Sequence, residues 1–458
     1  MTTAVQTSFF SKDRSFYKRF IIVMLTVTLQ NVVAYSVNMA DNIMLGSFSQ
    51  NALSGAATVN QIFFMVQQLA VGIGDTLVIV GSQYWGKKDM HSLRKVSGAG
   101  LKLALGGGIL MVVLCSLLPS QLMAIFTTDA AIAQQGMEYM RIVKYTFLLF
   151  LITQALLATL RSVETVQIAF TVSIISLCVN CSINYCLIFG KFGFPQLGIT
   201  GAAIGTLISR FVELVFVLIY ILKVDKKLCL FSENPFKKDP EISRTFSVVA
   251  AQVLIQELVW AISIPLQSAI IGHLSSDAIA ANSIATTFYQ YLKVIARAMA
   301  SATGVMIGSA IGKGDMNEVK AEGRTINIFA VTMGVILGLL LYALHTPLLS
   351  LYKLTPEAYS IANQLMLVMA ILMVAMSYQM PILNGIIRGG GDTKFTMWVN
   401  MGLTWAVVVP LSFLSAFVWH LPVALVVLIS QCDQILKCPI VLYRFRSYKW
   451  IRKLTKNA

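Results

Sequence analysis

Residues 41–90 read DNIMLGSFSQNALSGAATVNQIFFMVQQLAVGIGDTLVIVGSQYWGKKDM, and the chain holds a second, diverged copy of this segment. At a constant offset of 226 positions it aligns without a gap to residues 267–316, which read QSAIIGHLSSDAIAANSIATTFYQYLKVIARAMASATGVMIGSAIGKGDM. Only 8 of the 50 positions are identical, but both copies end on the same Gly-Lys-x-Asp-Met signature. Both copies lie in long apolar runs. A duplicated helical membrane chain is typical of secondary transporters, whose sites lie between the two halves.

The composition indicates a helical membrane protein. The 458 residues are 57% hydrophobic and 12% charged, with a mean hydropathy of +0.75, whereas a soluble domain carries roughly 25% charged residues. Apolar runs of about 20 residues recur along the chain, and each is long enough to cross a bilayer as a helix. The alternating ten-residue segments of a membrane β-barrel do not occur. We interpret the seven cysteines, most of which lie in apolar runs, as packing residues.

Twelve membrane-spanning helices are expected. They are placed at roughly residues 16–39, 52–80, 92–118, 132–160, 166–190, 198–223, 243–271, 278–311, 323–345, 357–387, 393–419 and 422–445. If the N-terminus is inside, 26 Lys and Arg fall in inside segments and only Lys191 and Lys353 in outside loops. This split predicts a multi-pass protein of the cell membrane with both termini in the cytoplasm. It also explains the net charge of +15 by contact with anionic membrane lipid rather than with nucleic acid.

The predicted fold class is all-α integral membrane, with 12 transmembrane helices in two parallel-repeat six-helix lobes around a central cavity. Because six is an even number, both lobes cross the membrane in the same sense. The expected order is a cytoplasmic tail (1–15), an N-lobe (16–223), a cytoplasmic linker (224–242), a C-lobe (243–445) and a basic cytoplasmic tail (446–458).

Polar residues follow one face of the first span. Asn31, Tyr35, Asn38 and Asp41 keep helical spacing. A charge in mid-membrane costs at least about 2.5–3.5 kcal/mol, so Asp41 needs an explanation. We favour a cation or proton site that lines a cavity. A hydrogen-bonded helix interface or a solvated helix end is the alternative.

Other polar residues extend this hypothesis. Asn180 and Asn184 are one turn apart in the fifth span, and their amide oxygens, with Asp41 and the Thr206 hydroxyl, are ligands that suit a hard cation. Each amide alone is equally suited to interhelical packing. In the seventh span, Glu257 lies beside Gln256 with no basic residue within a turn. It is either a proton-exchanging group or a neutral structural glutamate.

Basic and paired charges lie in the later spans. Asp433 and Lys437 are spaced i,i+4 with opposite sign, which predicts a local ion pair. Lys293 and Arg297 are spaced i,i+4 with the same sign, so they line a water-filled cavity or pair with carboxylates elsewhere. No Walker pattern and no Ser/His/Asp or HExxH arrangement occurs. Transport is therefore expected to be driven by an ion gradient, without a cofactor and without enzymatic activity.

Taken together, these features resemble the multidrug and toxic compound extrusion (MATE) family of cation-coupled antiporters over roughly residues 15–450. The segments that carry the resemblance are Asp41-Asn-Ile-Met-Leu-Gly46, Gly81-Ser-Gln83 with Gly86-Lys-Lys-Asp89, Asn180-x-x-x-Asn184, Gly198-Ile-Thr-Gly201-Ala-Ala, and Arg388-Gly389 with Gly391-Asp392-Thr393.

The resemblance implies export of amphipathic cationic drugs or metabolites in exchange for H⁺ or Na⁺, by a functional monomer with a central cavity. It implies coupling roles for Asp41, Asn180 and Glu257, with a possible Na⁺ site at Asp41 and Asn180. The candidate substrate-cavity residues are Asn31, Tyr35, Asn38, Gln67, Gln256, Tyr289 and Lys293. Two departures matter, because some members have an acidic residue where this chain has Asn184 or Ser377. They leave Asp41 as the first candidate for coupling and Glu257 as the second.

Two rival functions stay open from the sequence. A lipid-linked oligosaccharide flippase of the same superfamily would need several basic cavity residues, and Lys293 and Arg297 are the only hints of these. A membrane-embedded enzyme would need a His/Asp or metal constellation near one interface, which the sequence does not contain.

Overall fold

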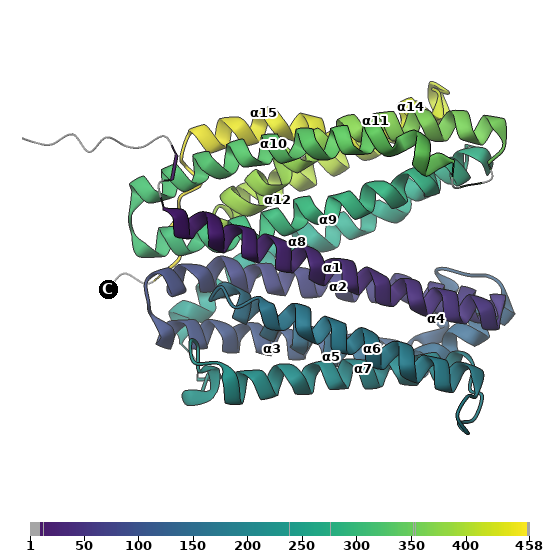
Figure 1. Ribbon diagram of the computed structural model, residues 1–458, viewed down its shortest axis with the longest axis horizontal. Coiled ribbons are helices and arrows are strands. Elements are labelled where there is room, and N and C mark those ends of the chain that lie inside the picture. Colours follow the sequence, from purple (N-terminus) through teal and green to yellow (C-terminus); the bar gives the residue numbers. More distant parts are fainter. Residues whose placement is uncertain are drawn as a thin grey trace, which may run out of the picture. The chain divides into compact units, whose positions relative to one another are not determined.

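The computed structural model describes residues 10, 11, 13–237, 239–274, 276–350, 352 and 354–455. Lys12, Lys238 and Lys353, which enter the predicted charge count, lie outside these residues, as do the ends of the two predicted tails. The described part of the chain is helical and contains no strand. Within each of two compact units, the helices lie side by side with their axes along a common direction (Figure 1).

The division into two units does not coincide with the midpoint of the chain. The N-unit comprises Leu29–Gly81 and Asp89–Ala250, and the C-unit comprises Met1–Thr28, Ser82–Lys88 and Ala251–Ala458. Three helices therefore contribute to both units: α1 (Arg14–Phe48), α2 (Gln50–Gly86) and α8 (Pro240–Gly272).

The remaining elements belong to one unit each. Those of the N-unit are α3 (Met90–Leu117), α4 (Pro119–Ala124), α5 (Ala130–Ser162), α6 (Gln167–Phe189), α7 (Ile199–Ile219), η1 (Tyr220–Val224) and η2 (Leu230–Ser232). Those of the C-unit are α9 (Ser276–Lys313), α10 (Met316–Leu349), α11 (Pro356–Met380), η3 (Pro381–Ile387), α12 (Thr393–Gly402), η4 (Leu403–Val408), α13 (Val409–Phe413), η5 (Leu414–Val418), α14 (Val423–Ser430) and α15 (Asp433–Arg446).

Eleven of the twelve predicted membrane-spanning helices coincide with helical segments of the described residues that are long and apolar enough to cross a membrane. The sixth predicted span, 198–223, is helical as α7 and η1 but is not among these eleven. The last predicted span is not continuous, because α14 ends at Ser430 and α15 begins at Asp433 after a short turn. The all-α membrane fold class is confirmed, and the break in this span is a feature that apolar periodicity did not indicate.

The repeated Gly-Lys-x-Asp-Met signature has a structural explanation. In both copies its aspartate caps the next helix. Asp89 accepts a hydrogen bond from the Ser92 backbone N–H, and Asp315 accepts from the N–H groups of Asn317 and Glu318. A carboxylate at this position satisfies donors that the first helical turn leaves unpaired. The signature thus ends one long helix and begins the next.

The glycines of the signature meet each other inside the C-unit. A Cβ added to Gly86 would lie 1.9 Å from the Ser309 carbonyl oxygen, and one added to Gly312 would lie 2.0 Å from the Gln83 carbonyl oxygen. Gly86 and Gly312 are repeat-equivalent, and so are Gln83 and Ser309. The contact is therefore reciprocal, as at a local twofold axis, and only glycine allows the two backbones to approach this closely.

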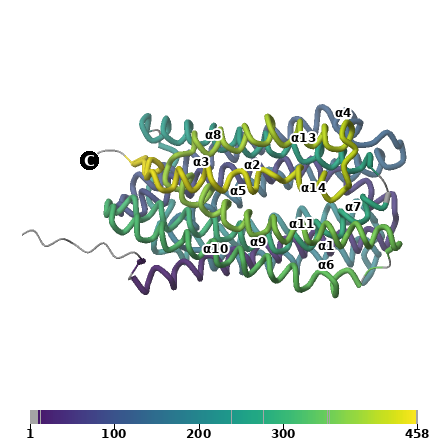
Figure 2. Tube along the Cα trace, turned by 90° about the horizontal axis from the view of Figure 1, so that it is seen from above, coloured from purple at the N-terminus to yellow at the C-terminus, as the bar shows by residue number. Residues whose placement is uncertain are grey.

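The chain after α15 packs onto the C-unit. Trp450 is fully buried, and Gln83 binds this segment twice, since its amide donates to the Arg452 carbonyl oxygen (3.1 Å) and its Oε1 accepts from the Leu454 N–H (2.8 Å). Buried Asp392 pairs with Arg444 and, at 2.9 Å, with Arg452. Figure 2 shows this C-terminal segment at one end of the C-unit helices.

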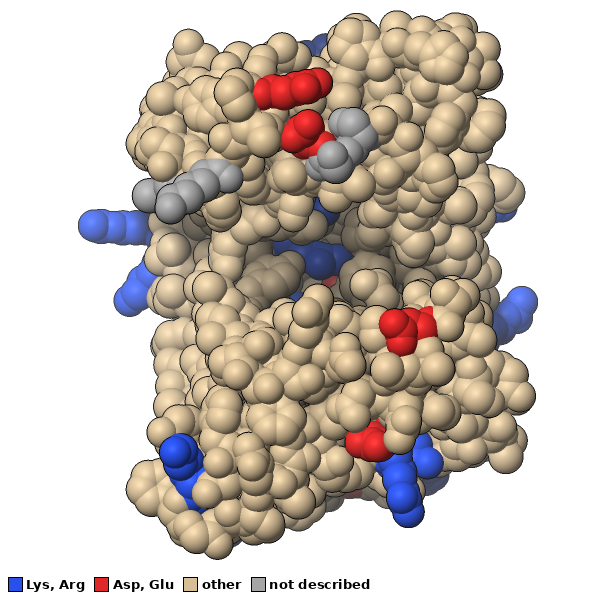
Figure 3. All heavy atoms as spheres, turned by 90° about the vertical axis from the view of Figure 1, so that its right-hand side faces the viewer, with Lys and Arg blue, Asp and Glu red and all other residues tan. Residues whose placement is uncertain are grey.

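The opposite ends of the helices carry a surface dominated by uncharged residues. Figure 3 views the ends where α4 and the loop between α6 and α7 lie, and its acidic and basic side chains are scattered rather than clustered.

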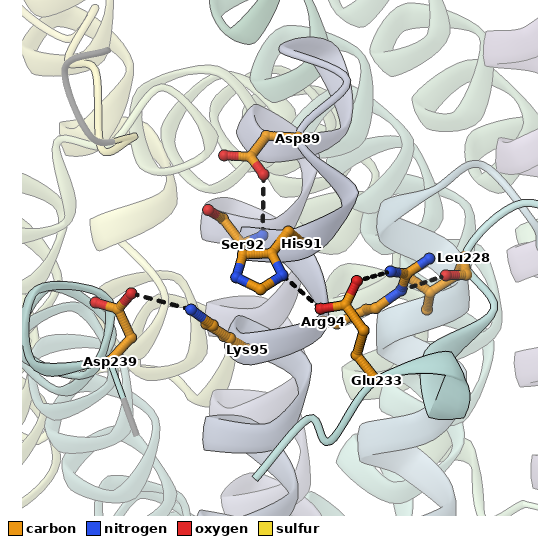
Figure 4. A network of polar contacts seen from close by, with 8 residues as sticks. All are labelled: Asp89, His91, Ser92, Arg94, Lys95, Leu228, Glu233 and Asp239. Carbon is orange, nitrogen blue, oxygen red and sulfur yellow. Dashed lines mark hydrogen bonds and ion pairs between the residues drawn. The ribbon is translucent and has the colours of Figure 1, made fainter. Parts of the chain in front are cut away.

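The segment predicted as an inter-lobe linker is held against α3 in the N-unit (Figure 4). Glu233 pairs with Arg94 at 2.7 Å and with His91, and Asp239 pairs with Lys95 at 3.4 Å. Arg94 also donates from Nε to a main-chain oxygen of this segment, at Leu228. Residues 228–237 and Asp239 therefore form part of the N-unit.

Candidate functional site

A hydrogen-bonded cluster in the N-unit joins α1 to α6. The Asn184 side-chain amide donates from Nδ2 to Asp41 Oδ1 at 2.6 Å, and the same nitrogen lies 3.3 Å from Asn180 Oδ1. Asn180 and Asn184 are fully buried, whereas Asp41 is partly exposed. The four-residue spacing puts both amides on one face of α6. The structure therefore brings together Asp41, Asn180 and Asn184, for which the sequence predicts a shared site.

Two glycines of α7 make room for this cluster. A Cβ added to Gly205 would lie 2.0 Å from Asn184 Oδ1, and one added to Gly201 would lie 2.7 Å from the Leu187 backbone. Gly201 and Gly205 thus allow α7 to pack closely against α6. Gly205 fixes the space that the Asn184 amide occupies, and so it acts on the hydrogen bond to Asp41.

Thr206 lies at the edge of the cluster rather than at its centre. Its hydroxyl donates to the Ala202 carbonyl oxygen at 2.9 Å and interacts with the side chain of Tyr139, a buried residue of α5. The charge of Asp41 also acts on Tyr139. Sequence reasoning missed Tyr139, because a tyrosine within an apolar run carries no pattern that separates it from packing residues.

Arg210 is a basic residue whose charge acts on the Asp41 cluster. Its guanidinium pairs with Glu213 at 2.6 Å and lies 5.0 Å over the Phe150 ring, so its charge is already partnered within α7 and α5. The charge of Arg210 acts on Asp41 from a distance. Within the residues that the structure describes, no basic side chain forms an ion pair with Asp41.

One amide group beside Asp41 retains unused hydrogen-bonding capacity. Asn184 Oδ1 is buried and has no hydrogen-bond partner in the described part of the chain, whereas the Asn180 side chain also interacts with the Asp41 carboxylate. Burying an amide atom without a partner costs about 1–3 kcal/mol. The cluster thus combines a carboxylate that has no ion-pair partner among the described residues with an amide oxygen left unsatisfied, which suits the reversible binding of a small positive ion.

Glu257 has a different environment in the C-unit. Its Oε1 pairs with Arg388 Nη1 at 2.8 Å, and the Gln256 amide lies 3.4 Å away. Both charged side chains are about nine-tenths buried, at 10% and 8% exposure. The partner is 131 positions away, at the end of η3, so no local pattern in the sequence indicates the pair. The charge of Glu257 is therefore compensated by the Arg388 guanidinium.

The candidate cavity residues fall into two sets. Asn31, Tyr35 and Asn38 on α1, with Gln67 on α2, are partly or fully exposed residues of the N-unit.

The second set is in the C-unit and comprises Gln256, Tyr289 and Lys293. Gln256 and Tyr289 are buried, and the Tyr289 hydroxyl lies 3.0 Å from Met376 Sδ. Lys293 is partly exposed, with Nζ 5.5 Å from the centre of the Trp260 ring.

Two further sequence predictions concern the C-unit. The Asp433–Lys437 ion pair is confirmed, with Nζ and Oδ2 2.7 Å apart. Ser377, at the position where some family members carry an acid, is fully buried and its hydroxyl has no hydrogen-bond partner among the described residues. Glu257 and Ser377 thus do not supply a pair of carboxylates here.

A metal site built on charged ligands alone does not occur in the described residues. No group of three or more His, Cys, Asp and Glu side chains lies close enough there to hold an ion. A cation at Asp41 would depend on the amide oxygens of Asn180 and Asn184.

The helical units, the sequence duplication and the carboxylates within membrane-spanning helices are typical of membrane transport proteins. The profile of the MatE family matches residues 27–186 and 253–414, once in each half of the chain. The chain belongs to the MatE family.

Individual relatives agree with this assignment. The chain is 24% identical over 428 residues to a probable multidrug resistance protein, NorM, of Thermotoga maritima, covering 93% of this chain and 91% of the relative. Its fold is similar to that of the Vibrio cholerae MATE transporter VcmN in the bent form, with a TM-score of 0.84, 16% identity and coverage of 96% and 99% of the two chains. It is also similar to a MOP superfamily transporter from Pyrococcus furiosus, with a TM-score of 0.83, 16% identity and coverage of 96% and 97%. These relatives confirm a transport protein rather than an enzyme.

Proposed function

We propose that this chain is a secondary active multidrug efflux antiporter, which exports amphipathic organic cations in exchange for protons. Family membership and the multidrug resistance protein of Thermotoga maritima support the transport class. The observation that carries the coupling role is the Asp41 carboxylate, bound by the Asn184 amide at 2.6 Å and not ion-paired within the described residues.

The proposed mechanism begins with an ionised Asp41 that accepts the Asn184 N–H. Protonation removes the charge that holds this hydrogen bond, because charge-assisted hydrogen bonds are roughly twice as strong as neutral ones. α1 and α6 then rearrange, and the affinity for the drug falls. The coupling is reciprocal, so a bound drug must weaken proton binding by the same factor.

Geometry favours a proton over Na⁺ at this carboxylate. A hard cation takes six or more oxygen ligands, or keeps water in their place. The contact that Asn184 makes with Asp41 is an N–H donor, and its Oδ1 lies on the side of Gly205. Na⁺ binding would require this amide to turn over, whereas a proton needs only the carboxylate oxygen.

The test is dye efflux from proteoliposomes with a pH gradient and a Na⁺ gradient imposed separately. We expect the pH gradient alone to drive efflux of a cationic dye by the wild type, and no efflux by Asp41→Asn. Efflux that follows only the Na⁺ gradient would show that the coupling ion is Na⁺ and not a proton. Transport of a lipid-linked oligosaccharide precursor without dye transport would show that the protein is a flippase and not a drug exporter.

The cellular setting of the proposal is a multi-pass protein of the cell membrane with both termini in the cytoplasm. The scattered charge on the surface in Figure 3 suits the outside, and the basic segments predicted from the sequence to lie inside suit the inner leaflet. Its partners are small amphipathic molecules and membrane lipid, and a monomer suffices because the site residues lie within single units.

A further inference from the structure

Two basic side chains in the C-unit form no ion pair with the residues that the structure describes. Lys293 and Arg297 lie one turn apart on α9, and neither has an ion-pair partner among the described residues. The Lys293 ammonium lies over the Trp260 ring of α8, and the charges of Arg297, Asp433 and Lys437 act on it. Its side chain is thus placed among α8, α9 and α15.

The acidic groups near this position are already engaged. Asp433 Oδ2 accepts from Lys437 at 2.7 Å and from the Gln434 amide at 2.9 Å. That amide group is held in turn by Gln379, which donates to its oxygen at 2.7 Å. The set of Lys293, Arg297, Lys437 and Asp433 therefore carries three positive charges and one negative charge, a surplus of two.

Glu257 does not offset this surplus. It pairs with Arg388 at 2.8 Å, so the two charges cancel each other. An uncompensated charge within a membrane span is costly and is found where it faces water or meets a counter-ion. Lys293 and Arg297 are both partly exposed, which leaves them accessible to a ligand.

The chemistry of these residues defines the ligand. A guanidinium presents a planar set of donors that matches a carboxylate or a phosphate, and an ammonium adds a compact charge. The Trp260 ring, over which the Lys293 ammonium lies, adds an aromatic side chain to the same place. The cluster suits an acidic group joined to an aromatic skeleton.

We propose that Lys293 and Arg297 form an anion-binding site for an acidic group, carboxylate or phosphate, of the transported molecule. The inference rests on the proposed efflux function and narrows its substrate class to amphipathic molecules that carry an acid beside their cationic group. The coupling ion then binds in the N-unit, and the acidic group of the substrate binds in the C-unit.

The test uses the full chain in phosphatidylcholine nanodiscs and two matched dyes, rhodamine B, which has a free carboxylate, and its ethyl ester, which has none. We expect fluorescence anisotropy to show rhodamine B bound at least about tenfold more tightly than the ester, as for a buried charge pair. Lys293→Gln combined with Arg297→Gln should remove this preference. Lys293→Arg combined with Arg297→Lys should keep most of it.

The control is Lys313→Gln, which removes a basic residue of the same helix that pairs with Glu318 at 2.9 Å outside the cluster. It should keep the full preference. Equal binding of both dyes by the wild type, tighter binding of the ester, or binding of neither would overturn the inference. So would a preference that survives the double Gln variant.

A further arm separates the substrate from a lipid headgroup. Adding phosphatidylglycerol to the nanodiscs should leave rhodamine B binding unchanged. Competition by this lipid that disappears in the double Gln variant would assign the site to lipid and overturn the substrate role. The binding assay needs no gradient, so it tests the anion-binding site independently of transport. If the proposed efflux function is wrong, neither dye will be transported under any imposed gradient, whatever the binding assay shows.

Discussion

Asp41 in the N-unit and Glu257 in the C-unit are both carboxylates within membrane-spanning helices, but the partner of the first is uncharged and the partner of the second is a cation. Asp41 is bound by the neutral amide of Asn184 at 2.6 Å, whereas Glu257 is bound by the guanidinium of Arg388 at 2.8 Å. The charge of Glu257 is thus compensated by an arginine, whereas the hydrogen-bond partner of Asp41 is uncharged and no ion-pair partner of Asp41 occurs among the described residues. The difference separates a group suited to ion exchange from one suited to holding two helices together.

The largest expected effect is on exchange by the Asp41 variant. Asp41→Asn should lower proton-driven efflux by at least about 100-fold, the scale for removing an essential proton-transfer group. Efflux per folded transporter in proteoliposomes measures this. Glu257→Gln, in the fraction that folds, should retain most of its exchange. Equal losses in both variants would erase the distinction between the two carboxylates.

The second prediction concerns stability, which the Glu257 substitution should lower more than the Asp41 substitution does. Glu257→Gln leaves Arg388 buried without its counter-charge, which should cost about 3–5 kcal/mol of folding free energy. The double variant Glu257→Gln with Arg388→Gln should recover most of this loss. Denaturation in detergent checks both. A Glu257→Gln protein as stable as Asp41→Asn would contradict the structural role of the pair.

The third prediction tests the support of the Asp41 cluster. Gly205→Ala would place a methyl group 2.0 Å from Asn184 Oδ1, so the amide must move away from Asp41. We expect a loss of about 1–3 kcal/mol, as for overpacked cores, together with reduced efflux. Gly106→Ala is the matched control, because nothing lies within 4 Å of its added Cβ. Identical behaviour of the two variants would show that Gly205 does not position the amide.

A fourth prediction uses the repeat. Gly86→Ala and Gly312→Ala create clashes of 1.9 and 2.0 Å with repeat-equivalent carbonyl oxygens. Because the contact is reciprocal, both should destabilise the protein by a similar amount, about 1–3 kcal/mol. Thermal unfolding of the two variants side by side measures this. A large difference between them would contradict a symmetric contact.

The smallest effect is expected at the segment docked on α3. The hydrogen bond from His91, followed by the charge of Arg94, lowers the pKa of Glu233 from its ordinary value of 4.5. A group whose pKa is lowered on folding stabilises above its unfolded pKa and loses that effect as the pH falls through its folded pKa. Proteolysis near Lys226 and Lys227 should therefore increase below about pH 4.5. Glu233→Gln should show the faster cleavage already at neutral pH.

Much of this architecture could be predicted from sequence. Apolar run length and charge distribution predict the helices because a bilayer imposes both. The Asn180 and Asn184 spacing predicts a common face, since that depends only on helical period. In contrast, the Glu257–Arg388 pair joins residues 131 positions apart, and no local pattern encodes it. The docking of residues 228–239 depends partly on main-chain oxygens such as Leu228 O, which have no side-chain signature.

The division of α1, α2 and α8 between the two units has a mechanical consequence. The chain passes from one unit to the other at Thr28–Leu29, Gly81–Ser82 and Ala250–Ala251, all inside helices, and at Lys88–Asp89 in a turn. Thr28 donates to the Met24 carbonyl oxygen at 2.8 Å, a back-bond that favours local bending. Alternating exposure of a substrate would then require α1, α2 and α8 to bend at these positions. A substitution that stiffens one of these helices should therefore slow turnover without altering a ligand contact.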